Sequence, residues 1–427
     1  MKELKKDILF IHFLKKNKNL LNYNKIRYIN FSIFKFTIFF FFFFVIIFLN
    51  DKAKLKEDKF DSMEDSFQKA KEFINNSING ISYNNKTFIL TEKPKVSVII
   101  PIYNCKDFIL RAIKSIQNQN LLEIEIILVN DFSTDNTLNV LKNIQKEDQR
   151  IKIMNNRKNM GILYSRSIGA LTAKGKYIFP LDNDDMFLDK DVFTVIINIA
   201  ENGNFDIVQF KGICLISEES VILKRKIKNT LFSGHKLNLV LFQPKLGLFP
   251  LLPPDEFGKK YKLNAVYLWG KCIKTAIYQK SINKMGKDRY SRNVLNFEDV
   301  VAIYTIFNIA QSYKFVGKYG ILKISRKNNA NSLKHTTIEI NIVNIYFADI
   351  AIDFTQKNKD NYIFLVYLLL FILNRPQLNE TLNSHFSVRK LFFSCFNRII
   401  NSKFISTSHK FEIRKTIKNL KYINNNI

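Results

Sequence analysis

The stretch VSVIIPIYNCKDFILRAIKSIQNQNLLEIEIILVND, residues 96–131, carries the pattern that decides the fold. It opens with a short apolar run that ends at Pro101, which is typical of a buried strand. Residues 108–119 place isoleucine and alanine at the i, i+3, i+4 and i+7 spacing of one helix face, and residues 124–129 form a second apolar run. The stretch therefore predicts a strand, an amphipathic helix and a second strand.

The same alternation continues further along the chain. The polar turn 131–135 precedes a helical pattern, and later strands are expected at residues 151–154 and 177–181, with a helix at 162–173 between them. Strands that alternate with helices predict an α/β fold with a doubly wound, mostly parallel sheet. Ligands bind beyond the carboxyl ends of the strands in such sheets, so the polar residues at those ends should share one crevice. These residues are Tyr103, Asn104, Asp131, Asp182, Asn183, Asp184 and Asp185.

The composition of the chain narrows its class. The 427 residues leave room for two or three domains at roughly 150 residues each. A hydrophobic fraction of 47% excludes wholesale disorder, and the four cysteines form no CxxC pair, which excludes a disulfide scaffold and a zinc-finger array. The net charge is +29, but the lysines are spread along the chain without an aromatic-interleaved basic module. We therefore interpret this charge as a solvated surface and expect no nucleic-acid partner.

Residues 31–49, FSIFKFTIFFFFFFVIIFL, form a candidate membrane segment. As a helix they would extend about 28 Å, close to the roughly 30 Å of a bilayer core. Lys35 lies near one end, where its side chain can reach the interface. Because 30 residues precede the segment, it does not resemble a cleaved signal peptide, and we expect a transmembrane signal anchor. A buried helix of a soluble domain is the alternative.

Charge on the two sides of this segment predicts its orientation. Residues 1–30 are basic, whereas the following stem, residues 50–93, mixes acids with lysines. The positive-inside rule places the basic tail in the cytosol and the bulk of the chain across the membrane, as in a single-pass type II protein. In a eukaryotic cell that bulk would lie in the lumen of the ER or Golgi. Sequons at Asn75, Asn85 and Asn379 add slight support, because such tripeptides arise by chance in an asparagine-rich chain.

An acidic cluster, Asp182-Asn183-Asp184-Asp185, directly follows the fourth expected strand. Mutual repulsion makes three carboxylates in four residues costly unless a cation or water screens them. Mg²⁺ and Mn²⁺ prefer oxygen ligands, commonly a few carboxylates together with substrate phosphates. The cluster is therefore a candidate clamp for a metal and a diphosphate, and a solvated acidic turn is the alternative.

An ordered series of motifs resembles the family 2 glycosyltransferases, which have the GT-A fold. Each motif is loose alone, but the whole series is specific and extends over more than half of the chain. The motifs are VSVIIPIYN at 96–104, IILVNDFSTD at 126–135, NMG at 159–161 with Arg166 and Gly169, AKGKYIFPLDNDD at 173–185, LWGK at 268–271 and FED at 297–299.

The resemblance implies a metal-dependent, inverting hexosyl transfer from a nucleotide-diphosphate sugar, with a UDP-sugar favoured, to a hydroxyl of a glycan, protein or lipid acceptor. Asp299, with Glu298 beside it, resembles the family's catalytic base. Asp182 and Asp184 resemble the Asp-x-Asp pair that holds Mn²⁺ or Mg²⁺, and Asp184 is favoured for direct metal contact. The family's nucleotide pocket, in which Asp131 would bind the nucleobase, corresponds to Pro101, Tyr103, Asn104, Asp131, Arg166, Asp182 and Asn183.

Three residues depart from the family pattern: Asn130 replaces a usual Asp, Phe132 a frequent Gly, and Ser167 a common Asn. One alternative is therefore a membrane-anchored pseudoenzyme that binds nucleotide sugars without transferring them. A basic, membrane-tethered scaffold is another. Asp299 itself has a second interpretation as a helix-start residue, because acids are favoured at that end of the helix dipole.

The C-terminal third matches no pattern that we recognise. Residues 362–373, YIFLVYLLLFIL, are too short to span a bilayer and predict a buried or interfacial helix. The expected organisation is a cytosolic tail at 1–30, an anchor at 31–49, a stem at 50–93, a GT-A domain at 94–330 and a helical region at 331–427.

Overall fold

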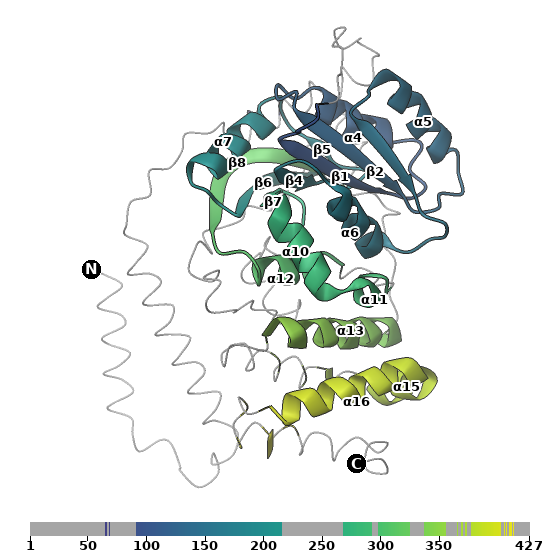
Figure 1. The fold of residues 1–427 in the computed structure, drawn as a ribbon. Coiled ribbons are helices and arrows are strands. Elements are labelled where there is room, and N and C mark those ends of the chain that lie inside the picture. The colour runs from purple at the N-terminus through teal and green to yellow at the C-terminus, as the bar shows by residue number, and fades with distance from the viewer. Residues whose placement is uncertain are drawn as a thin grey trace, which may run out of the picture. The chain divides into compact units, whose positions relative to one another are not determined.

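A computed structural model describes residues 91–215, 268–292, 298–324, 337–355 and 377–402, together with isolated residues at 65–68, 365–373 and 405–413 (Figure 1). These residues belong to one compact unit, Asp58–Ile427. The predicted anchor at 31–49 and the sequons at Asn75 and Asn85 lie outside the described residues. Within the described part of the chain, no helix has the length and apolar character needed to cross a bilayer.

An eight-stranded sheet organises the unit, in the order β3-β2-β1-β4-β7-β6-β8-β5. Its first half is parallel: β1 pairs with β2 and β4, and β2 pairs with β3. These strands lie where the apolar runs predicted them. The strands are β1 Val96–Ile102, β2 Ile124–Asn130, β3 Ile151–Asn155, β4 Tyr177–Pro180, β5 Met186–Phe187, β6 Ile207–Leu215, β7 Lys271–Lys274 and β8 Tyr313–Ile324.

The second half makes the sheet mixed rather than mostly parallel. β7 is antiparallel to both β4 and β6, and β5 is antiparallel to β8, whereas β6 and β8 are parallel. Strand β7 contains only Lys-Cys-Ile-Lys, so no apolar run marked it in the sequence. The α/β prediction is confirmed, and the arrangement is consistent with a GT-A fold, with the strand directions corrected in this half.

Helices cover both faces of the sheet, and successive side chains of β1 point alternately towards the two groups of helices. Val96, Val98 and Ile100 face the core beneath α4, α5 and α7, whereas Ile99 faces the core beneath α6, α10 and α12. Both faces of the strand are buried, which explains its continuous apolar run. The helices are α4 Ile109–Gln117, α5 Thr137–Glu147, α6 Ile162–Thr172, α7 Val192–Asn202, α10 Thr275–Met285, α11 Lys287–Tyr290 and α12 Glu298–Phe307.

Helix α6 approaches the sheet unusually closely at Gly169. A Cβ atom at this position would lie 2.7 Å from Cγ2 of Ile99 and 3.2 Å from Cγ2 of Val129. A larger side chain would push the helix away from β1 and β2. Gly169 thus fixes the height of α6 above the sheet, and with it the position of Arg166, one turn earlier on the same helix.

The C-terminal helices extend the core of the α6 face. Helices α13 Thr337–Thr355, α15 Leu378–Ser384 and α16 Phe386–Ile400 contact one another, and α13 contacts α12. The described residues of the 362–373 segment, Leu365, Leu369, Ile372 and Leu373, are helical and buried in the same core, which favours the buried over the interfacial form of the predicted helix. The rest of that segment lies outside the described residues.

Ion pairs join this region to α11. Asp349 of α13 pairs with Arg289 and Arg292, and Arg398 of α16 pairs with Asp349 and Asp353. Carboxylates on α13 thus connect residues of α11 and α16. The helical region is therefore integrated with the unit that contains the sheet rather than attached as an independent tail.

A buried ion pair stabilises the opposite face. Asp148 accepts hydrogen bonds from Nε and Nη2 of Arg150, at 3.0 and 2.9 Å, and from Nε2 of Gln117 on α4, at 3.0 Å. The side chains of Asp148 and Arg150 are 0% and 1% exposed. Removal of one member of such a pair leaves the other charge buried and uncompensated.

We expect Asp148→Ala to lower the free energy of unfolding by about 3–5 kcal/mol, because Arg150 loses its buried counter-charge. Urea unfolding followed by circular dichroism measures the change. Glu201→Ala is the control, because the Lys176–Glu201 pair is 57% and 37% exposed; this change should cost less than about 1 kcal/mol. Equal losses in the two variants would contradict the assignment.

Candidate active site

Hydrogen bonds tie together the loops that follow β1 and β2. Oδ1 of Asn104 accepts a hydrogen bond from the backbone N–H of Thr134 at 2.8 Å, and the N–H of Asn104 donates to Oγ of Ser133 at 3.1 Å. Asn104 has a φ of 45°, a left-handed conformation that asparagine tolerates better than most residues. Tyr103 next to it is 47% exposed. Tyr103 and Asn104, which are expected to bind the nucleotide, thus lie on a loop that hydrogen bonds hold in place, and the tyrosine is accessible to solvent.

Asp131 determines where α6 begins. Its Oδ1 accepts hydrogen bonds from Nδ2 of Asn156 at 2.7 Å and from the N–H of Met160 at 2.8 Å, and its Oδ2 accepts one from the N–H of Gly161 at 2.8 Å. A carboxylate has about four acceptor positions, so one remains in addition to these three bonds. The sequence suggested only a ligand role for Asp131, and the structure adds this structural one.

The three departures from the family pattern lie in different local environments. Phe132 has a φ of 62° and is 51% exposed, so glycine is the residue that its backbone would favour. Asn130 donates from Nδ2 to Oδ1 of Asn155 at 3.0 Å and accepts from the N–H of Ser133 at 3.2 Å, which makes it a neutral anchor of the turn. Ser167 is buried on α6.

The three carboxylates of the acidic cluster after β4 lie close together. Oxygens of Asp182, Asp184 and Asp185 lie within 4.8 Å of one another. Nδ2 of Asn183 donates to the carbonyl oxygen of Pro101 at 3.0 Å, which ties the cluster to β1. Three converging carboxylate oxygens match the ligand preference of Mn²⁺ and Mg²⁺, so these residues fit a divalent cation.

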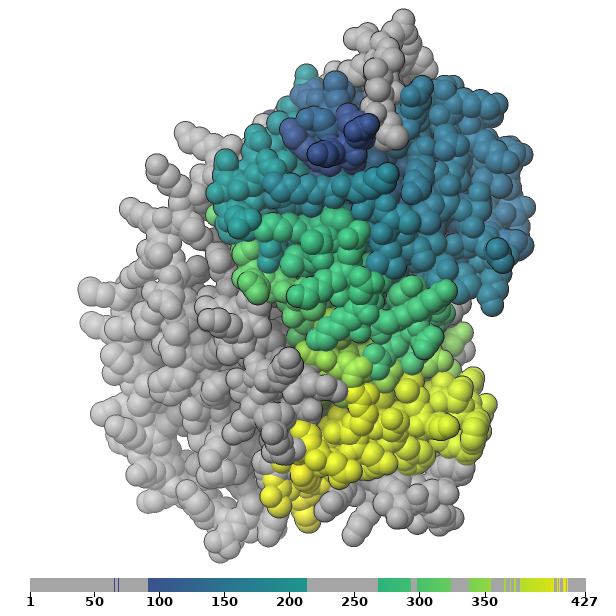
Figure 2. Space-filling model, viewed as in Figure 1, coloured from purple at the N-terminus to yellow at the C-terminus, as the bar shows by residue number. Residues whose placement is uncertain are grey.

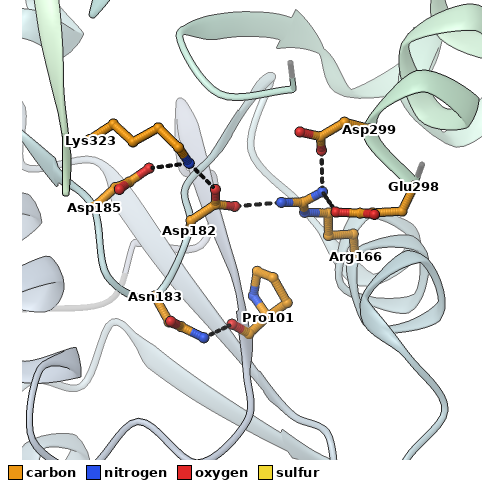
Figure 3. Close-up of polar contacts among 8 residues, drawn as sticks. All are labelled: Pro101, Arg166, Asp182, Asn183, Asp185, Glu298, Asp299 and Lys323. Atoms are coloured by element: carbon orange, nitrogen blue, oxygen red, sulfur yellow. Dashed lines mark hydrogen bonds and ion pairs between the residues drawn. The ribbon is translucent and has the colours of Figure 1, made fainter. Parts of the chain in front are cut away.

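Arg166 joins this cluster to the start of α12 (Figure 3). Its side chain is 4% exposed, and its guanidinium pairs with Asp182 through Nη2 and with Asp299 through Nη1. Oε1 of Glu298 lies 3.7 Å from Nη1. Asp182, the candidate metal ligand, and Asp299, the candidate base, are remote in the sequence, but both contact this one buried cation. The contacts make Arg166 a bridge between carboxylates, a position that the resemblance alone did not indicate.

Glu298 and Asp299 have different electrostatic surroundings at the first turn of α12. Burial, and then the neighbouring charge of Asp299, raise the pKa of Glu298 to about 7, against the opposing effect of Arg166. Oε2 of Glu298 is buried without a hydrogen-bond partner among the described residues. Near neutral pH, Glu298 is therefore partly protonated. Asp299 also occupies the helix-start position, so its two interpretations are compatible.

Lys323 is the functional-site residue that the sequence analysis missed. Its Nζ, near the end of β8, lies 3.3 Å from Oδ2 of Asp182 and 3.5 Å from Oδ2 of Asp185 (Figure 3). The same nitrogen lies 5.9 Å from the ring centroid of Trp269, which is itself only 6% exposed. The sequence feature that could have identified Lys323 is its position between Leu322 and Ile324 in an apolar strand, because a buried charge needs a partner.

Burial shifts the pKa of two further groups in the expected directions. It lowers the pKa of Lys271 on β7 to about 7, against the opposing charge of Asp299. It raises the pKa of the Cys105 thiol to about 12, and the charge of Asp135 acts in the same direction. Cys105 is therefore a poor nucleophile at neutral pH, because the thiolate is the reactive form.

Comparisons with known proteins agree with the motif series. Residues 97–245 match the family model described as glycosyl transferase family 2. A GalNAc(5)-diNAcBac-PP-undecaprenol beta-1,3-glucosyltransferase of Campylobacter jejuni is 36% identical over 145 residues, covering 34% of this chain and 44% of that protein. An uncharacterized glycosyltransferase of Haemophilus influenzae is 26% identical over 261 residues, covering 59% of this chain and 78% of that protein.

Among solved structures, S. aureus TarS 1–349 in complex with UDP-GlcNAc superposes with a TM-score of 0.48 at 16% identity, covering 72% of this chain and 80% of that one. The match to the Campylobacter protein spans less than half of that protein's length. The family match includes the strand ends, Asp131, Arg166 and the acidic cluster. Residues 97–245 of this chain are therefore similar to glycosyl transferase family 2, and the similarity includes the strand ends and the acidic cluster.

Proposed function

We propose that the protein transfers a hexosyl group from a nucleotide-diphosphate sugar to an acceptor hydroxyl, with a divalent metal and with inversion at the anomeric carbon. The observation that carries this proposal is the bridge at Arg166, which holds Asp182 of the acidic cluster and Asp299 of α12 on one guanidinium. An activated sugar bound beside this bridge would have a charge-binding site at the acidic cluster and a proton acceptor at Asp299.

The acidic cluster is the proposed metal site. Asp184 and Asp182 would hold Mn²⁺ or Mg²⁺, and the bound cation would neutralise charge that develops on the leaving diphosphate. Asn183, through its bond to Pro101, keeps the cluster against the end of β1. Arg166 holds Asp182 in place from a buried position, so the clamp is organised before a ligand arrives.

Asp299 is the proposed base that takes the proton of the acceptor hydroxyl. The guanidinium of Arg166 contacts its Oδ1 and orients the carboxylate. Glu298 is the less favoured candidate on geometry, because its Oε1 lies 3.7 Å from Nη1 of Arg166, whereas Asp299 is in direct contact with that nitrogen. A single base opposite the leaving group supports inversion by direct displacement, in contrast to the carboxylate pair of a retaining glycosidase.

The nucleotide is proposed to bind beyond β1 and β2. Tyr103 is accessible there for stacking on a base, and Asn104 braces the loop beside it. The acceptor position that remains on Asp131 suits a ring N–H donor such as N3–H of uracil, which favours a UDP-sugar.

The name of one relative and the N-terminal sequence bear on the acceptor and the cellular location. The Campylobacter relative is named for an undecaprenol-linked substrate, so we favour a lipid-linked saccharide over a free glycan or a protein. The apolar segment 31–49 and the basic tail before it support a single-pass anchor with type II orientation. In a eukaryotic cell this orientation would place the domain in the ER or Golgi lumen.

A catalytically inactive nucleotide-sugar-binding protein is the second candidate. Phe132 favours it, because a bulky residue at a φ of 62° strains the backbone next to Asp131. The full-length chain, supplied with a panel of nucleotide sugars and Mn²⁺, distinguishes the two. Nucleotide binding with sugar release or transfer supports the enzyme, and binding without either supports the inactive protein.

We expect Asp299→Asn to lower the turnover number by about 10²–10⁴-fold, the usual contribution of a general base. Nucleotide affinity, measured by calorimetry, should change little, because Asp299 is proposed to act on the acceptor. Glu298→Gln is the matched control and should lose far less turnover, because Glu298 lies further from the Arg166 guanidinium and is not the proposed base. A larger loss in Glu298→Gln would transfer the base assignment to Glu298.

We expect Asp184→Asn to weaken Mn²⁺ binding and to abolish transfer, because a neutral amide replaces a charged metal ligand. The electron paramagnetic resonance signal of free Mn²⁺ measures binding directly in the full-length chain. Asp189→Asn provides the control, because Asp189 pairs with Lys318 and lies outside the acidic cluster. Unchanged Mn²⁺ affinity in Asp184→Asn would remove Asp184 from the metal site.

A further inference from the structure

We infer that Lys323 is a built-in counter-cation of the acidic cluster, which competes with the divalent metal and gives up its carboxylates when a metal and a diphosphate bind together. This inference rests on the proposed metal site. It assigns to Lys323 a positioning role that neither the family motifs nor the sequence pattern indicated.

The first argument is the position of the ammonium group. Nζ of Lys323 lies 3.3 Å from Asp182 and 3.5 Å from Asp185, so it contacts two of the three clustered carboxylates. Its side chain is 17% exposed, and the Asp185 side chain is fully buried. Figure 3 shows the ammonium between the two carboxylates, on the side of Asp182 opposite to Arg166. A cation already occupies this part of the cluster.

The second argument is the charge of the cluster. Three carboxylates whose oxygens lie within 4.8 Å of one another repel unless cations compensate them. The Lys323 ammonium lies against two of these three carboxylates and compensates part of their charge while no metal is bound.

The third argument concerns which of the two cations can leave. Arg166 is 4% exposed and is held by carboxylates on both sides, so it cannot move without uncovering Asp299. Lys323 carries a compact charge on a flexible four-carbon stem, which can turn away while its backbone stays in β8. Lys323 is therefore the exchangeable cation of the site and Arg166 the permanent one.

The consequence is a coupling between metal and diphosphate. Like charges a few ångströms apart repel strongly in a partly buried site, so the Lys323 ammonium weakens metal binding to the free protein. A diphosphate at the same rim would offer the ammonium new anionic oxygens, and lysine binds phosphate readily. Because such coupling is reciprocal, a nucleoside diphosphate should tighten metal binding through Lys323.

The test compares Lys323→Met with Lys318→Met in the full-length chain. Lys318 lies on the same strand with its Nζ 2.8 Å from Asp189, so its loss removes a similar lysine outside the cluster. Free Mn²⁺ is counted by its electron paramagnetic resonance signal, with and without UDP. Without UDP, we expect Mn²⁺ to bind Lys323→Met about tenfold more tightly than the wild type, which corresponds to about 1.4 kcal/mol. Lys318→Met should match the wild type.

The effect of UDP provides the second readout. We expect UDP to tighten Mn²⁺ binding in all three proteins, because its diphosphate can itself ligate the metal. The tightening should be about tenfold smaller in Lys323→Met than in the wild type and in Lys318→Met, because the ammonium that adds to the coupling is gone. Should Lys323→Met fail to fold, Lys323→Gln serves in the same titrations. It keeps much of the side-chain length without the charge.

The outcomes separate the inference from the proposed function. Unchanged or weaker Mn²⁺ binding in the folded Lys323 variant, beside normal binding in the wild type, would overturn the role of Lys323 and leave the metal site intact. A wild-type chain that binds no Mn²⁺, with or without UDP, would overturn the metal site itself. Equal tightening in the Lys318 and Lys323 variants would attribute the effect to general surface charge and overturn the inference.

Discussion

The buried guanidinium of Arg166 is the interaction on which the geometry of the site depends. It joins Asp182, at the end of a strand, to Asp299, at the start of a helix that follows much later in the chain. A single planar group with forked donors imposes both the spacing and the relative orientation of the two carboxylates. Because Arg166 is buried, these contacts are screened little by salt, and neither carboxylate can move away without leaving a buried charge uncompensated. The site is therefore organised by the protein itself.

Two features of α6 place this guanidinium. Asp131 accepts backbone hydrogen bonds from Met160 and Gly161 and so sets where the helix begins. Gly169 lets the helix lie against β1 and β2 at a distance that no larger residue would permit. The proposed nucleobase residue, which follows β2, is thus hydrogen-bonded to the start of the helix that carries the bridge between the carboxylates. A change at Asp131 would be felt at Asp182 and Asp299 through the helix as well as through any bound nucleotide.

The sequence predicted the parallel half of the sheet, because buried parallel strands are continuous apolar runs and the intervening helices have a clear 3.6-residue period. It also predicted which polar residues follow the strands. It did not predict the antiparallel insertion of β7, whose four residues carry no pattern, nor the left-handed backbone at Phe132, which depends on the packing of neighbouring loops. The contacts of Arg166 and Lys323 were hidden for another reason. Each pairs with residues far along the chain, and local periodicity contains no information on such pairs.

The two basic residues at the acidic cluster illustrate why residue type matters as much as position. Both contact Asp182, from opposite sides, and a count of charges would treat them as equivalent. Arg166 is buried between acids from two elements and gains from remaining fixed. Lys323 approaches from a strand near the rim with a mobile point charge, and its partners include the residues suited to a metal. A site that binds and releases a charged ligand needs one cation that preserves the shape of the site and another that the ligand can displace. Arg166 has the first role and Lys323 the second.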